Sequence, residues 1–279
     1  MKRHLSEMFY KSYSSNDNSH KVIKILGIKL KFKHKNNFDE DINKMCRQIL
    51  TKLSLPDNVF RLNNIKFYVP NYPLDTIQRL IVDKSRFYEH DVLKELDNYI
   101  PEDAVICDIG ANIGNHSLYW ASNMKVKQIY AFEPVDTTYK ILKTNIKINK
   151  LENIIKPFNI GLSDEKGYGV INLYSNDNIG GTHIKKSDNL NGEKLNIDKL
   201  DNIEISEEKI DFIKIDVEGH ELFTLKGAEQ TINKYKPLIF IEIFAENSDT
   251  ITELLSSYGY TLKQTFRDNN YLFAPDKIK

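Results

Sequence analysis

Four mostly apolar runs in this sequence each end in an acidic residue, and these residues are Asp108, Glu133, Asp216 and Glu242. Runs of this length and composition are typical of strands buried in a parallel sheet. The carboxyl ends of parallel strands meet at one edge of the sheet, where open α/β folds bind their ligands. We therefore expect a ligand crevice at this edge, with Asp216 and Glu242 pointing into it.

The turn after the first of these runs has the pattern of a nucleotide-binding turn. Residues 105–115 read VICDIGANIGN, which indicates a buried strand, a tight turn and the start of a helix. Gly110 and Gly114 let the backbone approach a ligand and let the helix pack closely on the strand. The free N–H groups of the first helical turn attract an anion. A βα turn without a ligand would have the same pattern.

The residues around this turn favour S-adenosylmethionine as the nucleotide. A dinucleotide fingerprint requires glycines where this chain has Asn112 and Asn115. Asp108 would repel a pyrophosphate, but its charge suits a ligand with an ammonium or a sulfonium group. Glu133 follows Asp108 by 25 residues (133 minus 108), about where doubly wound folds place the carboxylate that binds ribose. The alternative is an NAD-type cofactor.

The composition fits a globular chain with a sizeable core, because 41% of the 279 residues are hydrophobic. Lys plus Arg and Asp plus Glu both number 39, and this net charge of zero argues against a nucleic-acid partner. Cys46 and Cys107 lie in apolar patterns and indicate a reducing compartment. No segment reaches the length of a membrane span and the start lacks a signal peptide, so we expect a cytoplasmic protein.

Residues 1–36 are predicted to form a basic, partly flexible leader, with nine Lys or Arg residues against Glu7 and Asp17. Within it, residues 28–33 (IKLKFK) alternate apolar and basic side chains, which predicts a strand. The lysines either protect an exposed sheet edge or contact an anionic membrane or glycan. Both interpretations are open at this point.

Residues 37–100 are predicted to form a helical extension. Apolar spacing predicts helices over residues 38–54, 74–82 and 89–100, and a short strand over residues 64–69. We expect this extension to lie over the mouth of the nucleotide-binding unit.

Residues 101–279 alternate strands and helices as a doubly wound fold does. Further strands are predicted over residues 128–134, 156–160, 211–216 and 237–244, and a terminal antiparallel hairpin over residues 261–266 and 271–274. Asp136 is expected to cap a helix that runs to about residue 150, and a single helix is expected to start near Glu221. A β-hairpin over residues 167–174 and 180–184 interrupts this rhythm. Its Asn178 and His183 are candidate acceptor contacts, unless they are only solvated turn residues.

Four motifs occur in the order and spacing of a known family: DIGANIG at residues 108–114, FEP at 132–134, Asn159 with GLS at 161–163, and KIDVEGHE at 214–221. Together they resemble the FkbM family of S-adenosylmethionine-dependent O-methyltransferases, from about residue 87 to the C-terminus. The resemblance implies an α/β fold of the Rossmann-like class I methyltransferase type. In that fold a seven-stranded, mostly parallel sheet, with its last strand antiparallel, carries helices on both faces. Residues 24–31 also resemble a leader seen on bacterial glycan-assembly proteins.

The resemblance also implies which residues bind the cofactor. Residues 108–114 would surround its methionine end, Glu133 would hold its ribose, and residues 159–163 would flank its adenine. Glu89 would close over the cofactor, unless it only caps a helix. The full implied set is Glu89, Asp108, Gly110, Asn112, Gly114, Asn115, Glu133, Pro134, Asn159, Ile160, Gly161, Leu162 and Asp216.

Methyl transfer to a hydroxyl group is an in-line displacement that needs alignment and a proton acceptor. The candidate catalytic residues are Asp216, Glu218, His220 and Glu242. His220 titrates near neutral pH when unperturbed, but at a helix start it would also serve as a cap. Asp216 and Glu242 are also candidate ligands of a divalent metal, although two carboxylates alone do not define such a site.

The resemblance predicts a sugar hydroxyl as the methyl acceptor, in a bacterial surface glycan such as capsule or lipooligosaccharide. Other methyltransferase chemistries fit less well. The chain lacks the Asn/Asp-Pro-Pro-aromatic run of N-methyltransferases after its fourth strand, and neither cysteine follows a proline as cytosine C5 chemistry requires. An NAD-type Rossmann oxidoreductase and a catalytically silent S-adenosylmethionine-binding module are the alternatives, and the oligomeric state is not predicted.

Overall fold

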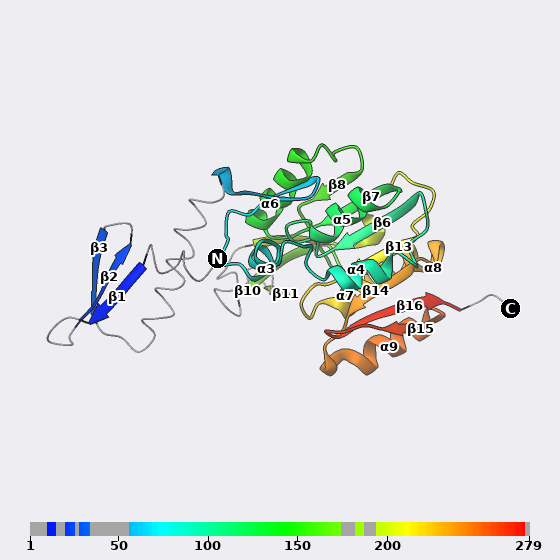
Figure 1. Cartoon of the computed structure of the whole chain (residues 1–279). Coiled ribbons are helices and arrows are strands. Elements are labelled where there is room, and N and C mark those ends of the chain that lie inside the picture. Colours follow the sequence, from blue (N-terminus) through cyan, green and yellow to red (C-terminus); the bar gives the residue numbers. More distant parts are fainter. Residues whose placement is uncertain are drawn as a thin grey trace. The chain divides into compact units, whose positions relative to one another are not determined.

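The computed structural model describes residues 10–14, 20–25, 28–33, 56–173, 182–186 and 194–276. The chain divides into two compact units, Met1–Ser54 and Leu55–Lys279. Within the described ranges, no helix is long and apolar enough to span a membrane. Figure 1 shows the elements of both units.

The first unit contains a three-stranded antiparallel sheet in the order β1-β2-β3, formed by Tyr10–Ser14, His20–Ile25 and Ile28–Lys33. β3 is the alternating strand that the sequence predicts, so this prediction is confirmed. It pairs with β2, with His20 opposite Lys33 and Ile25 opposite Ile28. Among the described strands β3 stands at a sheet edge, as the protective interpretation of its lysines requires. The predicted helix over residues 38–54 lies outside the described residues.

The second unit is built on a seven-stranded sheet in the order β15-β16-β14-β13-β6-β7-β8. Its strands are β6 (Ala104–Ile109), β7 (Val126–Phe132), β8 (Ile155–Phe158), β13 (Phe212–Ile215), β14 (Leu238–Glu242), β15 (Tyr260–Thr265) and β16 (Asn270–Pro275). The strands from β14 to β8 pair in parallel. β16 is antiparallel to both β14 and β15. This order confirms the Rossmann-like class I methyltransferase fold.

Alternate residues of the central strands enter two apolar cores. Ala104 and Ile106 of β6 belong to one core, whereas Val105 and Cys107 belong to the other, because side chains alternate between the faces of a strand. The first core includes residues of α5 (Asn115–Asn123) and α6 (Asp136–Ile148), and the second includes residues of α7 (Glu221–Lys226), α8 (Glu229–Tyr235) and α9 (Ser248–Ser257). Helices therefore cover both faces of the sheet, as Figure 1 shows.

Residues 56–100 pack into the first of these cores. They form a hairpin of β4 (Val59–Leu62) and β5 (Ile65–Tyr68), followed by α3 (Thr76–Lys84) and α4 (His90–Leu96). Phe67, Ile81 and Leu93 are fully buried there together with residues of α5 and α6. The strand and the two helices predicted over residues 64–100 are confirmed, whereas β4 was not predicted. The predicted boundary between residues 100 and 101 crosses this shared core.

Two helices differ from the prediction. Asp136 is the first residue of α6 and Val135 takes the N-cap position. The single helix expected near Glu221 is split into α7 and α8 around Gly227, where a Cβ would lie 1.8 Å from the Ser163 carbonyl oxygen. The helix is therefore interrupted where the backbone of Gly227 packs against the backbone of Ser163. Short 3₁₀ helices lie at η1 (Pro56–Asn58), η2 (Leu200–Asn202) and η3 (Ala245–Asn247).

The predicted hairpin insertion is part of a second sheet with the order β11-β10-β12-β9. β10 (Gly167–Leu173) pairs antiparallel with β11 (Thr182–Lys186), which confirms the hairpin. It also pairs with β12 (Lys194–Asp198), which runs parallel to β9 (Gly161–Leu162), and these pairings were not predicted. His183 lies on β11, and Asn178 lies outside the described residues. Their contacts with an acceptor stay predictions.

Candidate active site

A cleft opens at the carboxyl ends of the parallel strands in the second unit. The predicted cofactor residues that line it are Glu89, Gly110, Asn112, Glu133, Pro134, Ile160, Gly161, Leu162 and Asp216. The predicted catalytic residues Glu218 and Glu242 line it as well. Tyr88, Asp268 and Asn270 also line this cleft, although the sequence analysis did not include them. Five predicted residues do not line it, namely Asp108, Gly114, Asn115, Asn159 and His220.

The turn after β6 is held tightly by the strands on either side. The amides of Gly110 and Ala111 donate to the Phe132 carbonyl oxygen of β7, at 3.0 and 2.9 Å. Gly110 has a φ of +79°, and a Cβ there would lie 1.7 Å from the Asp216 carbonyl oxygen. Only glycine tolerates both the conformation and the contact. Gly114 packs against Leu142 of α6 instead of facing the cleft, since a Cβ there would lie 2.7 Å from Leu142 Cδ1.

Glu133, at the end of β7, uses both carboxylate oxygens to fix the backbone around the cleft. Its Oε2 accepts a hydrogen bond from the Asn112 amide at 3.0 Å, and its Oε1 accepts one from the Val135 amide at 2.9 Å. Burial raises the pKa of Glu133 to about 7, although these backbone donors oppose the shift. Each oxygen keeps a second lone pair, with which Glu133 can bind hydroxyl groups of a ligand.

Asn159 and Asn115 hold segments that line the cleft. The Nδ2 of Asn159 donates to the carbonyl oxygens of Glu133 and Pro134, at 3.0 Å each. The Oδ1 of Asn115 accepts a hydrogen bond from the Tyr88 amide at 2.9 Å, and its Nδ2 donates to the Tyr88 carbonyl oxygen at 3.1 Å. These two asparagines therefore position the backbone of residues that face the cleft.

Lys214 is a buried cation behind the cleft residues Gly110 and Asp216, with a side chain that is 3% exposed. Its Nζ donates to the Gly110 carbonyl oxygen at 2.9 Å and lies 3.2 Å from Asp216 Oδ2 and 3.4 Å from Asp108 Oδ1. Burial lowers the pKa of Lys214, but Asp216 and Asp108 outweigh burial, so the net shift is upward. Lys214 was not among the predicted site residues. The signal in the sequence is a single lysine inside the apolar run FIKI.

Asp108 faces the protein interior and does not present its carboxylate to a ligand. It is fully buried, and its Oδ2 accepts a hydrogen bond from Ser117 Oγ of α5 at 2.6 Å. With Lys214 on its other oxygen, Asp108 joins β6, β13 and the start of α5. The structure therefore assigns Asp108 an indirect role, where the sequence suggested direct contact with the cofactor.

Asp216, Glu218 and Glu242 bring three carboxyl groups into the cleft. Burial opposes ionisation of Asp216, but the charges of Lys214 and His116 outweigh burial and lower its pKa. Burial and the charge of Asp216 raise the pKa of Glu242, and the same two causes raise the pKa of Glu218 to about 7. Near neutral pH the cleft therefore holds an ionised Asp216, a protonated Glu242 and a Glu218 that exists in both forms.

This cluster does not fit a divalent metal ion. In the part of the chain that the structure describes, no group of three or more His, Cys, Asp or Glu side chains is arranged to hold a metal ion. Hard divalent cations such as Ca²⁺ and Mg²⁺ need about six oxygen ligands. The Lys214 ammonium already supplies the positive charge beside Asp216. The donor set therefore gives no support to a metal held by Asp216 and Glu242.

His220 faces away from the cleft. It is 3% exposed, its Nε2 lies 2.9 Å from Ser163 Oγ, and its ring stacks on Phe223 with the centroids 4.9 Å apart. Glu218 and Gly219, which precede it, have left-handed φ values of +51° and +91° and turn the chain. Direct contact between His220 and a reacting hydroxyl does not fit this arrangement.

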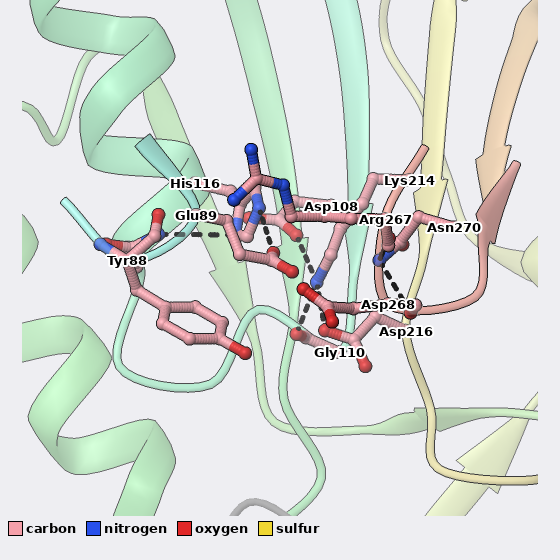
Figure 2. Close-up of polar contacts among 11 residues, drawn as sticks. Tyr88, Glu89, Asp108, Gly110, His116, Lys214, Asp216, Arg267, Asp268 and Asn270 are labelled. Carbon is pink, nitrogen blue, oxygen red and sulfur yellow. Dashed lines mark hydrogen bonds and ion pairs between the residues drawn. The ribbon is translucent and has the colours of Figure 1, made fainter. Parts of the chain in front are cut away.

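Glu89 enters the cleft from the loop before α4. It occupies the N-cap position of this helix, but its side chain makes no capping hydrogen bond, so the capping interpretation is not supported. Instead its Oε2 lies 3.2 Å from the Nε2 of His116. Figure 2 shows Glu89 together with Asp216 and with Asp268 from the turn between β15 and β16. Segments far apart in the sequence therefore meet at this cleft.

Residues 108–262 match the family model described as the Methyltransferase FkbM domain. The hexuronic acid methyltransferase AglP of Haloferax volcanii is 28% identical over 192 residues, covering 68% of this chain and 77% of the relative. Methyltransferase sdnD of Sordaria araneosa is 26% identical over 240 residues, covering 74% of this chain and 90% of the relative.

The crystal structure of an FkbM methyltransferase from Methylobacillus flagellatus KT aligns with a TM-score of 0.47 and 16% identity, covering 86% of this chain and 61% of that chain.

The family match spans more than half of the 279 residues and includes the glycine turn, the strand ends and the motif around Asp216. This match to a methyltransferase family gives no support to the alternative interpretation as an NAD-type oxidoreductase. The chain belongs to the FkbM family of methyltransferases.

Proposed function

We propose that this protein is an S-adenosylmethionine-dependent O-methyltransferase that acts on a sugar hydroxyl in the biosynthesis of a bacterial surface glycan, such as capsule or lipooligosaccharide. The observation that carries the proposal is that Glu133 lines the same cleft as the carboxyl groups of Asp216, Glu218 and Glu242. Glu133 suits the ribose of a nucleoside, and the other three suit a hydroxyl group that must lose its proton.

The residues of the cleft fit S-adenosylmethionine. The free lone pairs of Glu133 suit the two ribose hydroxyls, and Ile160 and Leu162 offer apolar surface to the adenine. The described lining contains acids such as Glu89 and Asp216 but no Lys or Arg, which suits the ammonium and sulfonium charges. When bound, this cofactor supplies a methyl group on a cationic sulfur, which is the electrophile of the reaction.

Glu218 is the general base in this proposal. The acceptor hydroxyl must lose its proton as its oxygen attacks, and a base works best when its pKa lies near the operating pH. The pKa of Glu218, about 7, meets this condition. Asp216 is a weaker base because its pKa is lowered, and Glu242 is protonated near neutral pH. These two groups hold the hydroxyl in line for displacement.

The choice of a sugar acceptor is supported by the relative from Haloferax volcanii, whose name is hexuronic acid methyltransferase. The proposal includes a contact between the first unit and an anionic glycan or the inner face of the membrane, for which the lysines of β3 would supply positive charge in addition to protecting a sheet edge. Together they favour a cytoplasmic enzyme that works close to a membrane on which glycan is assembled.

A thermal-shift titration with S-adenosylmethionine, S-adenosylhomocysteine and NAD tests the cofactor. A ligand at a hundred times its Kd stabilises a protein by about 2.7 kcal/mol, which raises Tm by several degrees in a chain of this size. We expect the two sulfur compounds to raise Tm and NAD to leave it unchanged. Glu133→Gln is expected to reduce the Tm shift caused by the two sulfur compounds. Both Glu133 oxygens accept hydrogen bonds from backbone N–H groups, and the amide group of glutamine would place its own N–H donors against one of them. The exposed Glu204→Gln is the matched control, and a shift with NAD alone would overturn the assignment.

Transfer of a labelled methyl group separates an enzyme from a catalytically silent module. The protein is incubated with labelled S-adenosylmethionine and with bacterial glycan fractions or nucleotide sugars, and the product is then treated with mild alkali. Methyl esters are hydrolysed by this treatment, whereas methyl ethers survive. Label that survives supports transfer to a hydroxyl group. Label that is released would identify a carboxylate as the acceptor, and cofactor binding without any transfer would support the silent module.

A further inference from the structure

A second recess adjoins the cleft at the start of α4. Its lining carries the three cations Lys84, Arg86 and Arg267 together with three acids, Glu89, Asp91 and Asp268. It shares Tyr88, Glu89 and Asp268 with the cleft. The described residues that line the cleft include six acids and no Lys or Arg. The electrostatic character of the surface therefore changes at the rim that the two cavities share.

Arg86 and Arg267 converge on a single carboxylate oxygen in this recess. Nη1 of Arg86 lies 3.6 Å from Asp91 Oδ2, and Nη2 of Arg267 lies 3.8 Å from the same atom. Both distances exceed those of normal hydrogen bonds, and the two arginine side chains are 45% and 64% exposed. Guanidinium groups present paired N–H donors that match a carboxylate or a phosphate. The two guanidinium groups thus offer N–H donors beyond those that face Asp91.

The backbone that carries Arg86 is constrained on both sides. Ser85, which ends α3, has a left-handed φ of +48°. Phe87 is buried, and its ring packs edge-on against Tyr119 with the centroids 5.2 Å apart. Arg86 therefore extends from a fixed position at the rim.

Arg267 is held by the tight turn between β15 and β16. Asp268 and Asn269, the two residues of this turn, both have a φ of +58°, which matches the twist of a β-hairpin. The Nδ2 of Asn270 donates to the carbonyl oxygens of Arg267 and Asp268, at 3.3 and 3.1 Å (Figure 2). The backbone that carries Arg267 is therefore fixed beside the cleft.

We infer that the recess formed by Lys84, Arg86 and Arg267 binds an anionic group of the methyl acceptor, either a carboxylate or a phosphate. This inference rests on the proposed function and narrows its acceptor to an anionic sugar. The cleft, lined by acids without Lys or Arg among the described residues, would repel such a group, whereas the exposed guanidinium groups of Arg86 and Arg267 offer it charge-assisted hydrogen bonds. The acceptor lies across the shared rim, with its anion on the two arginines and its hydroxyl beside Glu218. A uronic acid and a sugar phosphate both have this chemistry.

Calorimetric titration of the full chain, saturated with S-adenosylhomocysteine, tests the inference with glucuronic acid, glucose 1-phosphate and glucose at millimolar concentrations. We expect at least one anionic sugar to bind more tightly than glucose. The double variant Arg86→Gln/Arg267→Gln weakens this binding by about tenfold or more, because charge-assisted hydrogen bonds are lost. Arg267→Lys keeps the charge without the paired donors and gives an intermediate loss. Arg61→Gln, at an exposed arginine that lines neither cavity, leaves the binding unchanged.

The two anionic sugars distinguish the sources of the anion, since tighter binding of glucuronic acid identifies a carboxylate and tighter binding of glucose 1-phosphate identifies a phosphate. If S-adenosylhomocysteine binds but neither anion binds more tightly than glucose, the inference is overturned and the proposed function stands. Equal binding by the wild type and the double variant overturns it in the same way. If S-adenosylhomocysteine does not bind, the proposed function is overturned, and this inference falls with it.

Discussion

The ammonium group of Lys214 lies 3.2 Å from a carboxylate oxygen of Asp216, two residues further along the chain. Residues two apart on an extended strand point to the same side, so this contact needs no special backbone geometry. The same ammonium group binds the Gly110 carbonyl oxygen and faces Asp108. One buried side chain thus joins the ends of β6 and β13 and keeps Asp216 ionised.

Lys214→Met is expected to destabilise the fold by about 3–5 kcal/mol, because it leaves buried carboxyl groups without their counter-charge. Urea unfolding followed by circular dichroism measures this loss. Lys140→Met is the matched control, since Lys140 forms an exposed ion pair with Asp136 at 2.7 Å and such pairs contribute little. Equal unfolding midpoints for the two variants would contradict the central role of Lys214.

Gly110→Ala is expected to cost about 4 kcal/mol or more, or to prevent folding, because backbone strain and overlap with backbone act together. The added Cβ would lie 1.7 Å from the Asp216 carbonyl oxygen, at a φ of +79°. Gly167→Ala is the control, since nothing lies within 4 Å of its Cβ position. Thermal unfolding of both variants checks the expectation, and a Gly110→Ala variant as stable as Gly167→Ala would show that the turn is not packed in this way.

The rate of methyl transfer at saturating cofactor is expected to rise with pH through about 7. The ionised form of Glu218 accepts the proton, and burial raises its pKa to about 7, so activity is lost as the pH falls below that value. Glu218→Gln removes this acidic limb and lowers kcat/KM by roughly a hundred- to ten-thousand-fold. Glu133 titrates in the same range, so the affinity for S-adenosylhomocysteine is measured at each pH. If the Glu218→Gln variant kept the acidic limb of the pH–rate profile unchanged, another residue would have to be the general base.

His220→Ala is expected to lower Tm without changing the shape of the pH profile, because the ring is buried against Ser163 and Phe223. Loss of one buried hydrogen bond costs about 1–3 kcal/mol. Ser163→Ala removes the same hydrogen bond from the other side and is expected to behave alike. A folded His220→Ala variant that lost the acidic limb, while Ser163→Ala kept it, would restore His220 as the base.

The strands and turns around the cleft follow from local features of the sequence. The apolar composition of AVICDI is enough to predict a buried strand. The tight turn expected directly after this strand is enough to explain the glycine at position 110. The spacing from Asp108 to Glu133 predicted the position of Glu133 at the end of the next parallel strand. Such predictions succeed because each depends on a few neighbouring residues.

The partners of buried polar groups depend on distant segments, and here the prediction was incomplete. Lys214 binds Gly110, which lies 104 positions earlier. Asp268 reaches the cleft because β16 pairs with β14, and nothing near Asp268 signals that pairing. His220 turns away because of the left-handed φ of Glu218 and Gly219, which residue spacing does not reveal.

Four non-glycine residues that line the cleft, Glu89, Asn112, Glu218 and Asp268, have φ values of +53°, +51°, +51° and +58°. For residues with a Cβ this conformation costs about 1–2 kcal/mol each, a strain from which glycine is free. Glycine replacements at these positions would therefore relax the backbone while removing the atoms that face the ligand. In the cleft, substitutions that raise stability are therefore expected to lower activity. A selection for thermostable variants that did not also measure turnover would favour inactive proteins.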